Sequence, residues 1–271
     1  SEDRLIEYTI AGVQKSPDEV ATKASTLLGK GNVAIVGSAH STVEEQFYYK
    51  GIAQRTGAKV ALVSHYGEGD GLLLSEDRTP NLRGALVTDL IDSLPEEKLS
   101  ELSSAIESGA VRTLLVVNED VTSLGIAPQL LDQLNLIYVG PLANETSKVA
   151  DVVIPSLMVF EKDGSFINQS FRLQRFKAAV PGPAGIQPDF MVLEKIFAPL
   201  AGEKPAPVHI DSVWERLSSQ VEMIDETTRW RSIPEDGLPL APGALGDLPY
   251  VESKNLKYDP VAFKEALAAP I

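Results

Sequence analysis

The fold is decided by residues 32–64, which read NVAIVGSAHSTVEEQFYYKGIAQRTGAKVALVS. The opening run NVAIV is apolar and β-branched, which is typical of a strand buried in a parallel sheet. Ser41 or Thr42 is expected to cap a following helix, because a hydroxyl can accept hydrogen bonds from the free N–H groups of a first turn. The closing run KVALVS is a second strand of the same kind. The stretch therefore predicts a strand–helix–strand unit with parallel strands.

The same alternation continues on both sides of this unit. Upstream, a helix is expected to begin after Ser16 and to extend to about Leu28, because Ser16 and Glu19 have the spacing of a capping box. Downstream, we expect strands at 113–117 (TLLVV), 136–139 (LIYV) and 152–154 (VVI), helices over about 95–109 and 127–133 and at Asn144, and a Gly-rich loop at 67–84. Five strands that alternate with helices predict an α/β fold, with a doubly wound, mostly parallel sheet and helices on both faces.

The remaining sequence changes in character. Helical periodicity of apolar residues predicts amphipathic helices over 188–200 and 211–224, and beyond Thr228 the sequence is typical of an extended tail. We therefore expect a Rossmann-like α/β domain over residues 1–205. A C-terminal helix and extended tail over 206–271 are expected to pack on this domain or on a partner.

Composition excludes several classes of function. The 271 residues include 24 Lys and Arg against 38 Asp and Glu, and a net charge of −14 repels phosphate backbones, so nucleic acid is not an expected partner. With no cysteine, the chain has no disulfide, no thiolate catalysis and no cysteine-ligated zinc or iron–sulfur cluster. No apolar run approaches the ~20 residues of a membrane span, and no signal peptide is evident. We expect a cytoplasmic protein without direct membrane insertion, and a start at Ser1 is compatible with a cut piece of a longer polypeptide or a processed start.

Several short motifs are weak candidates for chemistry. The turn after NVAIV carries one glycine, which disfavours a conventional NAD site and leaves an anion site or a plain turn open. Residues 67–71 (GEGDG) lack the ligand order of a calcium loop, so a mobile loop is favoured. His40, His65 and His209 show no metal-ligand spacing; the first two both follow strands, yet surface or capping roles are favoured. The sequence has no GxSxG elbow, and we predict no catalytic residue and no metal site.

The most unusual stretch is FEKDGSFINQSFRLQRF at 160–176, directly after the strand ADVVIP. Asp163-Gly164 predicts a tight turn, followed by an extended run over 165–168. The polar side chains of this stretch are expected to satisfy backbone groups and one another in a loop that crosses the top of the sheet. They are Glu161, Asn168, Arg172 and Arg175. The stretch predicts a polar knot, either functional or structural.

These residues also carry a family resemblance. In order along the chain they are ADVVIP at 150–155, Glu161 to Ser165, Asn168, Arg172, Gln174-Arg175 and GIQPDF at 185–190. Their order and spacing resemble a signature of the molybdopterin oxidoreductase superfamily and of the related iron–sulfur subunit of bacterial complex I (NADH-quinone oxidoreductase). The strand ends in NVAIVGSAHS and in LLVVNED at 114–120 are similar to strand ends of the same family. The resemblance implies a domain of the formate dehydrogenase and DMSO reductase type.

In cofactor-bearing members of this family, such strand ends cradle a pterin guanine dinucleotide. The matching positions are Gly37, Ser38, Asn118 and Asn144. The chain departs from the family pattern because Asn118 replaces a Gly, Val121 replaces a Pro, and residues 169–171 replace x-Glu-Gly. We therefore expect a vestigial cradle without molybdopterin, with iron–sulfur clusters only in the N-terminal part of the parent protein. The residues expected to be structural are Glu161, Gly164, Asn168 and Arg172.

The resemblance leaves more than one function open. The first interpretation is a C-terminal structural domain of that NADH:quinone oxidoreductase subunit, in the peripheral arm of complex I, with no molybdenum and no activity of its own. Its partners would be other subunits of a respiratory complex, and it would lie at the inner membrane through them. The alternative is a fragment or split subunit of a pterin-dependent molybdenum or tungsten oxidoreductase, such as a formate or formylmethanofuran dehydrogenase. A free-standing module that binds a small ligand is a third hypothesis.

Overall fold

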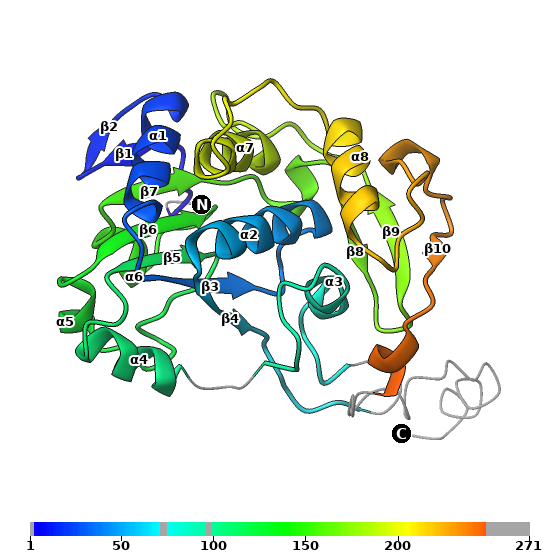
Figure 1. Ribbon diagram of the computed structural model, residues 1–271, viewed down its shortest axis with the longest axis horizontal. Helices are drawn as coiled ribbons and strands as arrows, with labels where there is room; N and C mark the ends of the chain where they lie inside the picture. The colour runs from blue at the N-terminus through cyan, green and yellow to red at the C-terminus, as the bar shows by residue number, and fades with distance from the viewer. Residues whose placement is uncertain (1–2, 71–74, 96–98, 248–271) are drawn as a thin grey trace, which may run out of the picture.

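A seven-stranded sheet forms the centre of the molecule. The computed structural model describes residues 3–70, 75–95 and 99–247 (Figure 1). Five strands run parallel in the order β4-β3-β5-β6-β7, namely β3 (Val33–Ser38), β4 (Lys59–Val63), β5 (Thr113–Val117), β6 (Asn135–Gly140) and β7 (Val152–Pro155). The chain passes from β3 to β4 on one side and returns to β5 on the other, which makes the carboxyl ends of β3 and β5 a topological switch point. The predicted doubly wound, mostly parallel α/β fold is confirmed.

A short hairpin extends this sheet beyond β7. It consists of β1 (Thr9–Ile10) and β2 (Val13–Gln14), and β1 pairs antiparallel with β7. The two turn residues, Ala11 and Gly12, have φ angles of 49° and 74°, as a tight type I′ turn requires. Sequence patterns did not predict this hairpin, because two-residue strands are too short to show an alternating pattern.

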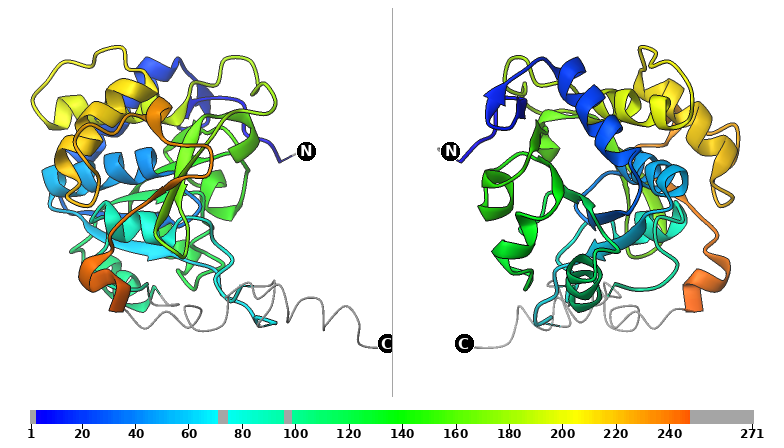
Figure 2. Two further views of the ribbon diagram at one scale, coloured as in Figure 1. Left: turned by 90° about the vertical axis from the view of Figure 1, so that its right-hand side faces the viewer. Right: turned by 60° about the vertical axis from the view of Figure 1, so that its left-hand side comes forward.

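Helices cover both faces of the sheet (Figure 2). On one face lie α1 (Pro17–Leu28), α2 (Val43–Thr56) and α7 (Asp189–Leu200), and on the other lie α4 (Ser100–Glu107) and α5 (Pro128–Leu131). Successive strand residues point to opposite faces, so that Ile35 packs in the first layer and Val36 in the second. Capping boxes begin α1 at Ser16 and α2 at Thr42, as the sequence predicted.

Two further helices differ from expectation or are very short. The expected loop over 67–84 is wrong at its end, because α3 (Leu82–Val87) begins at Leu82. All six residues of α3 are buried and no side chain caps its start, so tertiary packing rather than a local signal forms it. The helix expected from about 95 begins at Ser100 among the described residues, and residues 96–98 lie outside them. The turn expected at Asn144 is α6 (Glu145–Lys148).

A small antiparallel sheet stands beside the main one, behind α8 (Ile210–Gln220) in Figure 1. Its strands are β8 (Gly164–Ile167), β9 (Arg172–Phe176) and β10 (Leu238–Pro239), in the order β10-β9-β8. Short 3-10 turns precede or flank these strands: η1 (Val159–Glu161), η2 (Trp230–Ser232) and η3 (Gly243–Asp247). The small sheet contains the 160–176 stretch that the sequence singled out.

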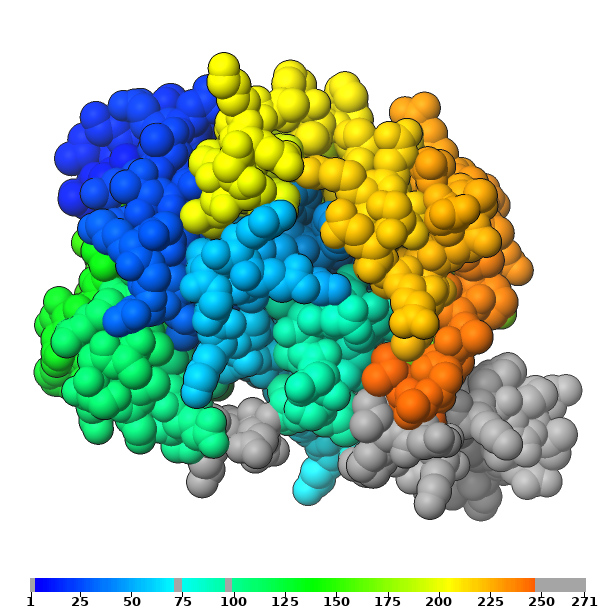
Figure 3. Space-filling view, viewed as in Figure 1, coloured from blue at the N-terminus to red at the C-terminus, as the bar shows by residue number. Residues whose placement is uncertain are grey.

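The segment beyond residue 205 packs on the rest of the chain as far as it is described (Figure 3). Both tryptophans are buried, with Trp214 0% and Trp230 3% exposed. Their ring N–H groups donate to Glu44 Oε1 at 2.7 Å and to the carbonyl of Gly164 at 3.1 Å. The part of the expected tail over residues 248–271 lies outside the described residues. None of the described helices combines the length and apolar character that a membrane crossing requires.

Candidate functional site

Three polar residues meet at the switch point of the sheet. Ser38 ends β3, His65 follows β4 and Glu119 follows β5. The hydroxyl of Ser38 donates to Glu119 Oε1 at 2.5 Å, and His65 Nε2 lies 3.0 Å from Glu119 Oε2. Glu119 is 5% exposed. We call this arrangement the Ser38–Glu119–His65 clasp, and it occupies the place where doubly wound folds bind ligands.

Burial governs the electrostatics of the clasp. Burial raises the pKa of the Glu119 carboxyl, although hydrogen bonds from Ser38 and the nearby His65 act in the opposite direction. The ring of His40 lies 5.9 Å from that of His65. Burial, and then the proximity of His65, lower the pKa of the His40 imidazole. Both shifts favour the neutral forms of these groups.

A second buried pair lies close to the clasp. Arg83 Nη1 donates to Asp77 Oδ2 at 3.1 Å, and both side chains are 3% exposed. The other oxygen of Asp77 accepts from the backbone N–H and the hydroxyl of Thr79. This buried arginine is thus engaged by a carboxylate of the chain itself.

The predicted cradle residues lie at the strand ends, but the protein fills their surroundings. A Cβ on Gly37 would lie 3.3 Å from Leu62 Cδ1. Asn118 has a φ of 58°, and its buried Oδ1 has no hydrogen-bond partner in the described part of the chain. Asn144 caps α6 by accepting from the N–H of Ser147 at 2.8 Å. Sequence reasoning chose Ser38 but missed Glu119, which directly follows the strand end it had singled out.

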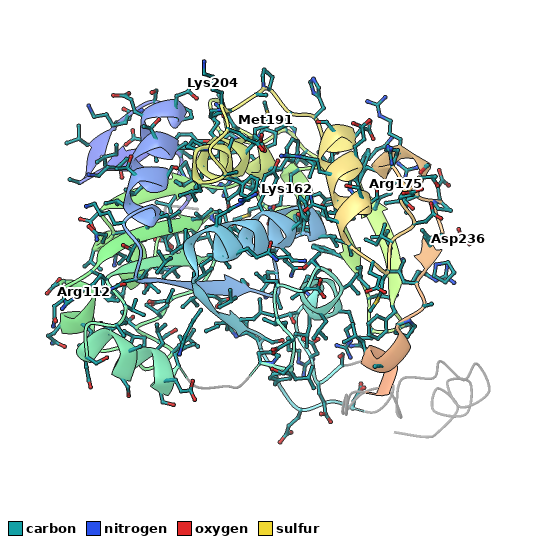
Figure 4. The ribbon with its side chains drawn as sticks, in the orientation of Figure 1. Arg112, Lys162, Arg175, Met191, Lys204 and Asp236 are labelled. Carbon is teal, nitrogen blue, oxygen red and sulfur yellow. The ribbon has the colours of Figure 1, made fainter. Side chains whose placement is uncertain are left out.

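A buried cluster of three charges lies behind α2. Lys162 Nζ lies 2.5 Å from Glu45 Oε1 and 2.6 Å from Asp189 Oδ2, and none of these side chains is more than 9% exposed. Figure 4 places Lys162 in the interior beside α2. Burial and the neighbouring Glu45 raise the pKa of Asp189 to about 7, because one ammonium cannot neutralise two carboxylates. Burial disfavours the charged lysine, but the two carboxylates outweigh it and raise the pKa of Lys162.

The expected structural residues of the 160–176 stretch bind distant segments. Glu161 Oε2 accepts from Arg4 Nη2 at 2.5 Å and from the N–H of Met158 at 2.8 Å. Asn168 Oδ1 accepts from the N–H of Arg172 at 3.0 Å. Arg172 Nη1 donates to the carbonyls of Asp236 and Gly237, both at 3.0 Å. Arg175 Nε donates to the carbonyl of Ile233 at 2.7 Å.

The expected tight turn at Asp163-Gly164 is wrong. Gly164 is the first residue of β8, and its φ lies outside the left-handed region. A Cβ at this position would lie 2.8 Å from Thr42 Cγ2 and 2.9 Å from Phe176 Cζ. Close packing of β8 against α2 and β9, rather than a turn, therefore accounts for the glycine.

The remaining candidates form no metal site. His209 precedes α8, where its N–H donates to Ser212 Oγ at 3.0 Å. Residues 71–74, which include the end of the GEGDG segment, lie outside the described residues. Within 3–70, 75–95 and 99–247, no three His, Asp or Glu side chains gather as a metal site would need.

The fold and the signature together define an α/β domain of the type found in large redox enzymes. A family model described as Molybdopterin oxidoreductase matches residues 10–198, and the chain belongs to this family.

Curated relatives are subunits of oxidoreductases. The chain is 30% identical to the F420-dependent formate dehydrogenase 2 subunit alpha of Methanococcus maripaludis, over 54% of this chain and 25% of that one. It is 29% identical to a putative formate dehydrogenase of Bacillus subtilis, over 39% of this chain and 11% of that one. It is 31% identical to the NADPH-Fe(3+) oxidoreductase subunit alpha of Geobacter sulfurreducens, over 47% of this chain and 14% of that one. The chain therefore spans a quarter or less of these relatives, and they correct the expected emphasis from complex I to formate dehydrogenase.

The strand ends do not fit an anionic pterin dinucleotide. A diphosphate is held by converging N–H donors or cations that it can approach closely. At the switch point this chain instead presents the carboxyl of Glu119 and the unpartnered acceptor of Asn118. A Cβ direction at Gly140 is filled by the hydroxyl of Tyr138, 2.5 Å away. The described residues thus do not provide the cradle that the family resemblance implied.

Proposed function

We propose that this chain is one α/β domain of a formate-dehydrogenase-type molybdopterin oxidoreductase, and that it serves there as a scaffold rather than as the pterin-holding part. The family match over residues 10–198 and relatives named as formate dehydrogenase subunits support the enzyme type. The Ser38–Glu119–His65 clasp is the observation that supports the scaffold role. Other subunits or domains of the oxidoreductase would supply metal, pterin and iron–sulfur clusters, and the cytoplasmic location stays a prediction.

The scaffold role has a physical basis in the clasp. A diphosphate placed between β3 and β5 would meet a buried carboxyl and would have to break two hydrogen bonds that Glu119 makes. Leaving Ser38 and His65 without their acceptor adds to that cost. The chain itself contributes no catalytic residue to the proposal.

The test uses the native assembly that contains this chain. Formate oxidation with an artificial electron acceptor is measured on the assembly, together with molybdenum, tungsten and the fluorescence of the oxidised pterin. We expect formate oxidation by the assembly, and neither metal nor pterin on this chain after separation under non-denaturing conditions. Stoichiometric pterin on the separated chain would contradict the scaffold role, and absence of formate oxidation would contradict the enzyme type.

A structural domain in the peripheral arm of a complex-I-type NADH:quinone oxidoreductase is the second candidate. Strand ends closed by the chain's own side chains favour it, because that interpretation expects a domain without molybdopterin. In the same assay, quinone reduction by NADH without formate oxidation would favour this candidate over the first.

A further inference from the structure

Exposed apolar side chains gather where β6 and β7 end. In the described part of the chain, eight large hydrophobic side chains are exposed, and four of them follow these two strands. They are Leu142 (39% exposed), Val159 (38%), Phe160 (68%) and Val180 (50%), which we call the carboxyl-edge patch. Isolated exposed apolar residues are ordinary, but a group on adjoining loops marks an interaction surface.

Hydrogen bonds and an ion pair join the loops that carry the patch. The N–H groups of Ala179 and Val180 both donate to the carbonyl of Phe160, at 2.8 and 3.0 Å. Arg4 forms a β-bridge with Leu142 and an ion pair with Glu161 at 2.5 Å, so it links the loop after β6 to the loop after β7. Figure 2 (left) shows the start of the chain beside the green strands, on the side away from α8.

The patch is held in place before any partner binds. Glu161 closes η1 by accepting from the N–H of Met158, and Arg4 Nη1 donates to the carbonyl of Pro141 at 3.0 Å. The side chains of Arg4 and Glu161 are only 12% and 16% exposed, so the ion pair is partly desolvated beside the apolar residues. Preorganised apolar groups with a polar border are the features of a binding surface, because little conformational entropy is lost on association.

We propose that the carboxyl-edge patch docks against an apolar surface of the remainder of the same oxidoreductase, a conclusion that rests on the proposed function. The relatives extend well beyond the matched region, which covers only 11–25% of their length, so most of such an enzyme has to contact this domain from outside. The patch residues lie within residues 10–198, the part that the family model matches. Phe160, the most exposed of the four, is the central anchor.

The test places a photo-crosslinking amino acid at position 160 in the native assembly. After irradiation, we expect a crosslinked peptide whose sequence belongs to another part of the molybdopterin oxidoreductase. The same substitution at Val13, which is 59% exposed on β2, is the matched control and is expected to give no such crosslink. A crosslink from position 160 to a second copy of this chain, or no crosslink, would overturn the proposal.

A variant measures the strength of the contact. Phe160→Ser is expected to leave the urea midpoint of the isolated chain unchanged and to weaken its association with the assembly about tenfold or more, whereas Val13→Ser changes neither. Unchanged association in Phe160→Ser would count against the patch. These readouts are independent of formate turnover, so an assembly that crosslinks as expected but does not oxidise formate would contradict the proposed enzyme type and not the docking surface.

Discussion

Lys162 is the residue on which three separate segments depend. It precedes β8, while Glu45 belongs to the first turn of α2 and Asp189 to the first turn of α7. Two carboxylates at helix N-termini are favoured by the helix dipoles, and one ammonium between them keeps their burial possible. The cluster therefore fixes how the small sheet meets the first helix layer.

Removal of this ammonium is expected to be costly. Lys162→Met leaves two buried carboxylates without a cation, and we expect the free energy of unfolding to fall by about 3–5 kcal/mol. Lys195→Met is the control, because Lys195 pairs with an Asp18 that is 78% exposed and should lose less than about 1 kcal/mol. Urea unfolding followed by the fluorescence of the two buried tryptophans measures both, and equal losses would contradict the role of the cluster.

The cluster also predicts a pH dependence with a definite sign. The pKa of Asp189 is raised from 3.8 to about 7, so the folded chain holds a proton that the unfolded chain has released. The resulting stabilisation is complete below about pH 4 and is lost as the pH rises to about 7. We therefore expect the stability of the wild type relative to Asp189→Asn to fall between pH 4.5 and 7.5. A difference that rises or stays constant across urea unfolding curves in this range would contradict the assignment.

At the scale of elements, side chains take the place of a strand along the outer edge of β8. The N–H of Ser165 donates to Glu44 Oε2 at 3.1 Å, and the N–H of Ile167 donates to Asn81 Oδ1 at 2.8 Å. Glu44 and Asn81 are 1% and 0% exposed. An edge strand is thereby satisfied internally and cannot pair with another chain on that side.

The close approach of β8 to α2 predicts the effect of a side chain at its first residue. Gly164→Val should destabilise the protein by about 1–3 kcal/mol through overpacking against Thr42 and Phe176. If this contact is the cause, the double variant Gly164→Ala with Phe176→Ala should lose less than the sum of the single variants. Thermal unfolding measures these variants, and strict additivity would point to another cause.

At the scale of the whole molecule, one apolar core extends across the expected boundary at residue 205. Val213, Trp214 and Leu217 of α8 belong to the same cluster as Ile35 of β3 and Phe47 of α2. Trp230 joins this cluster and donates to the first residue of β8. The segment after 205 thus completes the layer over α2 and the small sheet.

A chain that ends at residue 205 is therefore expected not to fold cooperatively. It would expose the apolar surface that Trp214 and Leu217 cover, both 0% exposed in the complete chain. Heat-capacity measurements should show a broad or absent transition and the truncated chain should bind an apolar dye. A chain that ends at residue 247 is the control and should unfold in one transition, and a sharp transition in the shorter chain would show an independent domain.

The sequence determined the elements of the main sheet and of most helices around it. Apolar β-branched runs predicted β3 to β7, and capping boxes predicted the starts of α1 and α2, because these signals act between neighbouring residues. The resemblance over 150–190 led to the family, although it placed the emphasis on complex I rather than on formate dehydrogenase.

Only the tertiary structure decided the contents of the sites. Ser38 and Glu119 are 81 residues apart in the chain, and Lys162 and Glu45 are 117 apart, so no local pattern connects them. The same holds for α3, which lacks a cap and forms because its surroundings bury it on all sides. Which buried charges meet is determined by how the layers pack, since a charge can stay in the interior only where a distant segment brings it a partner.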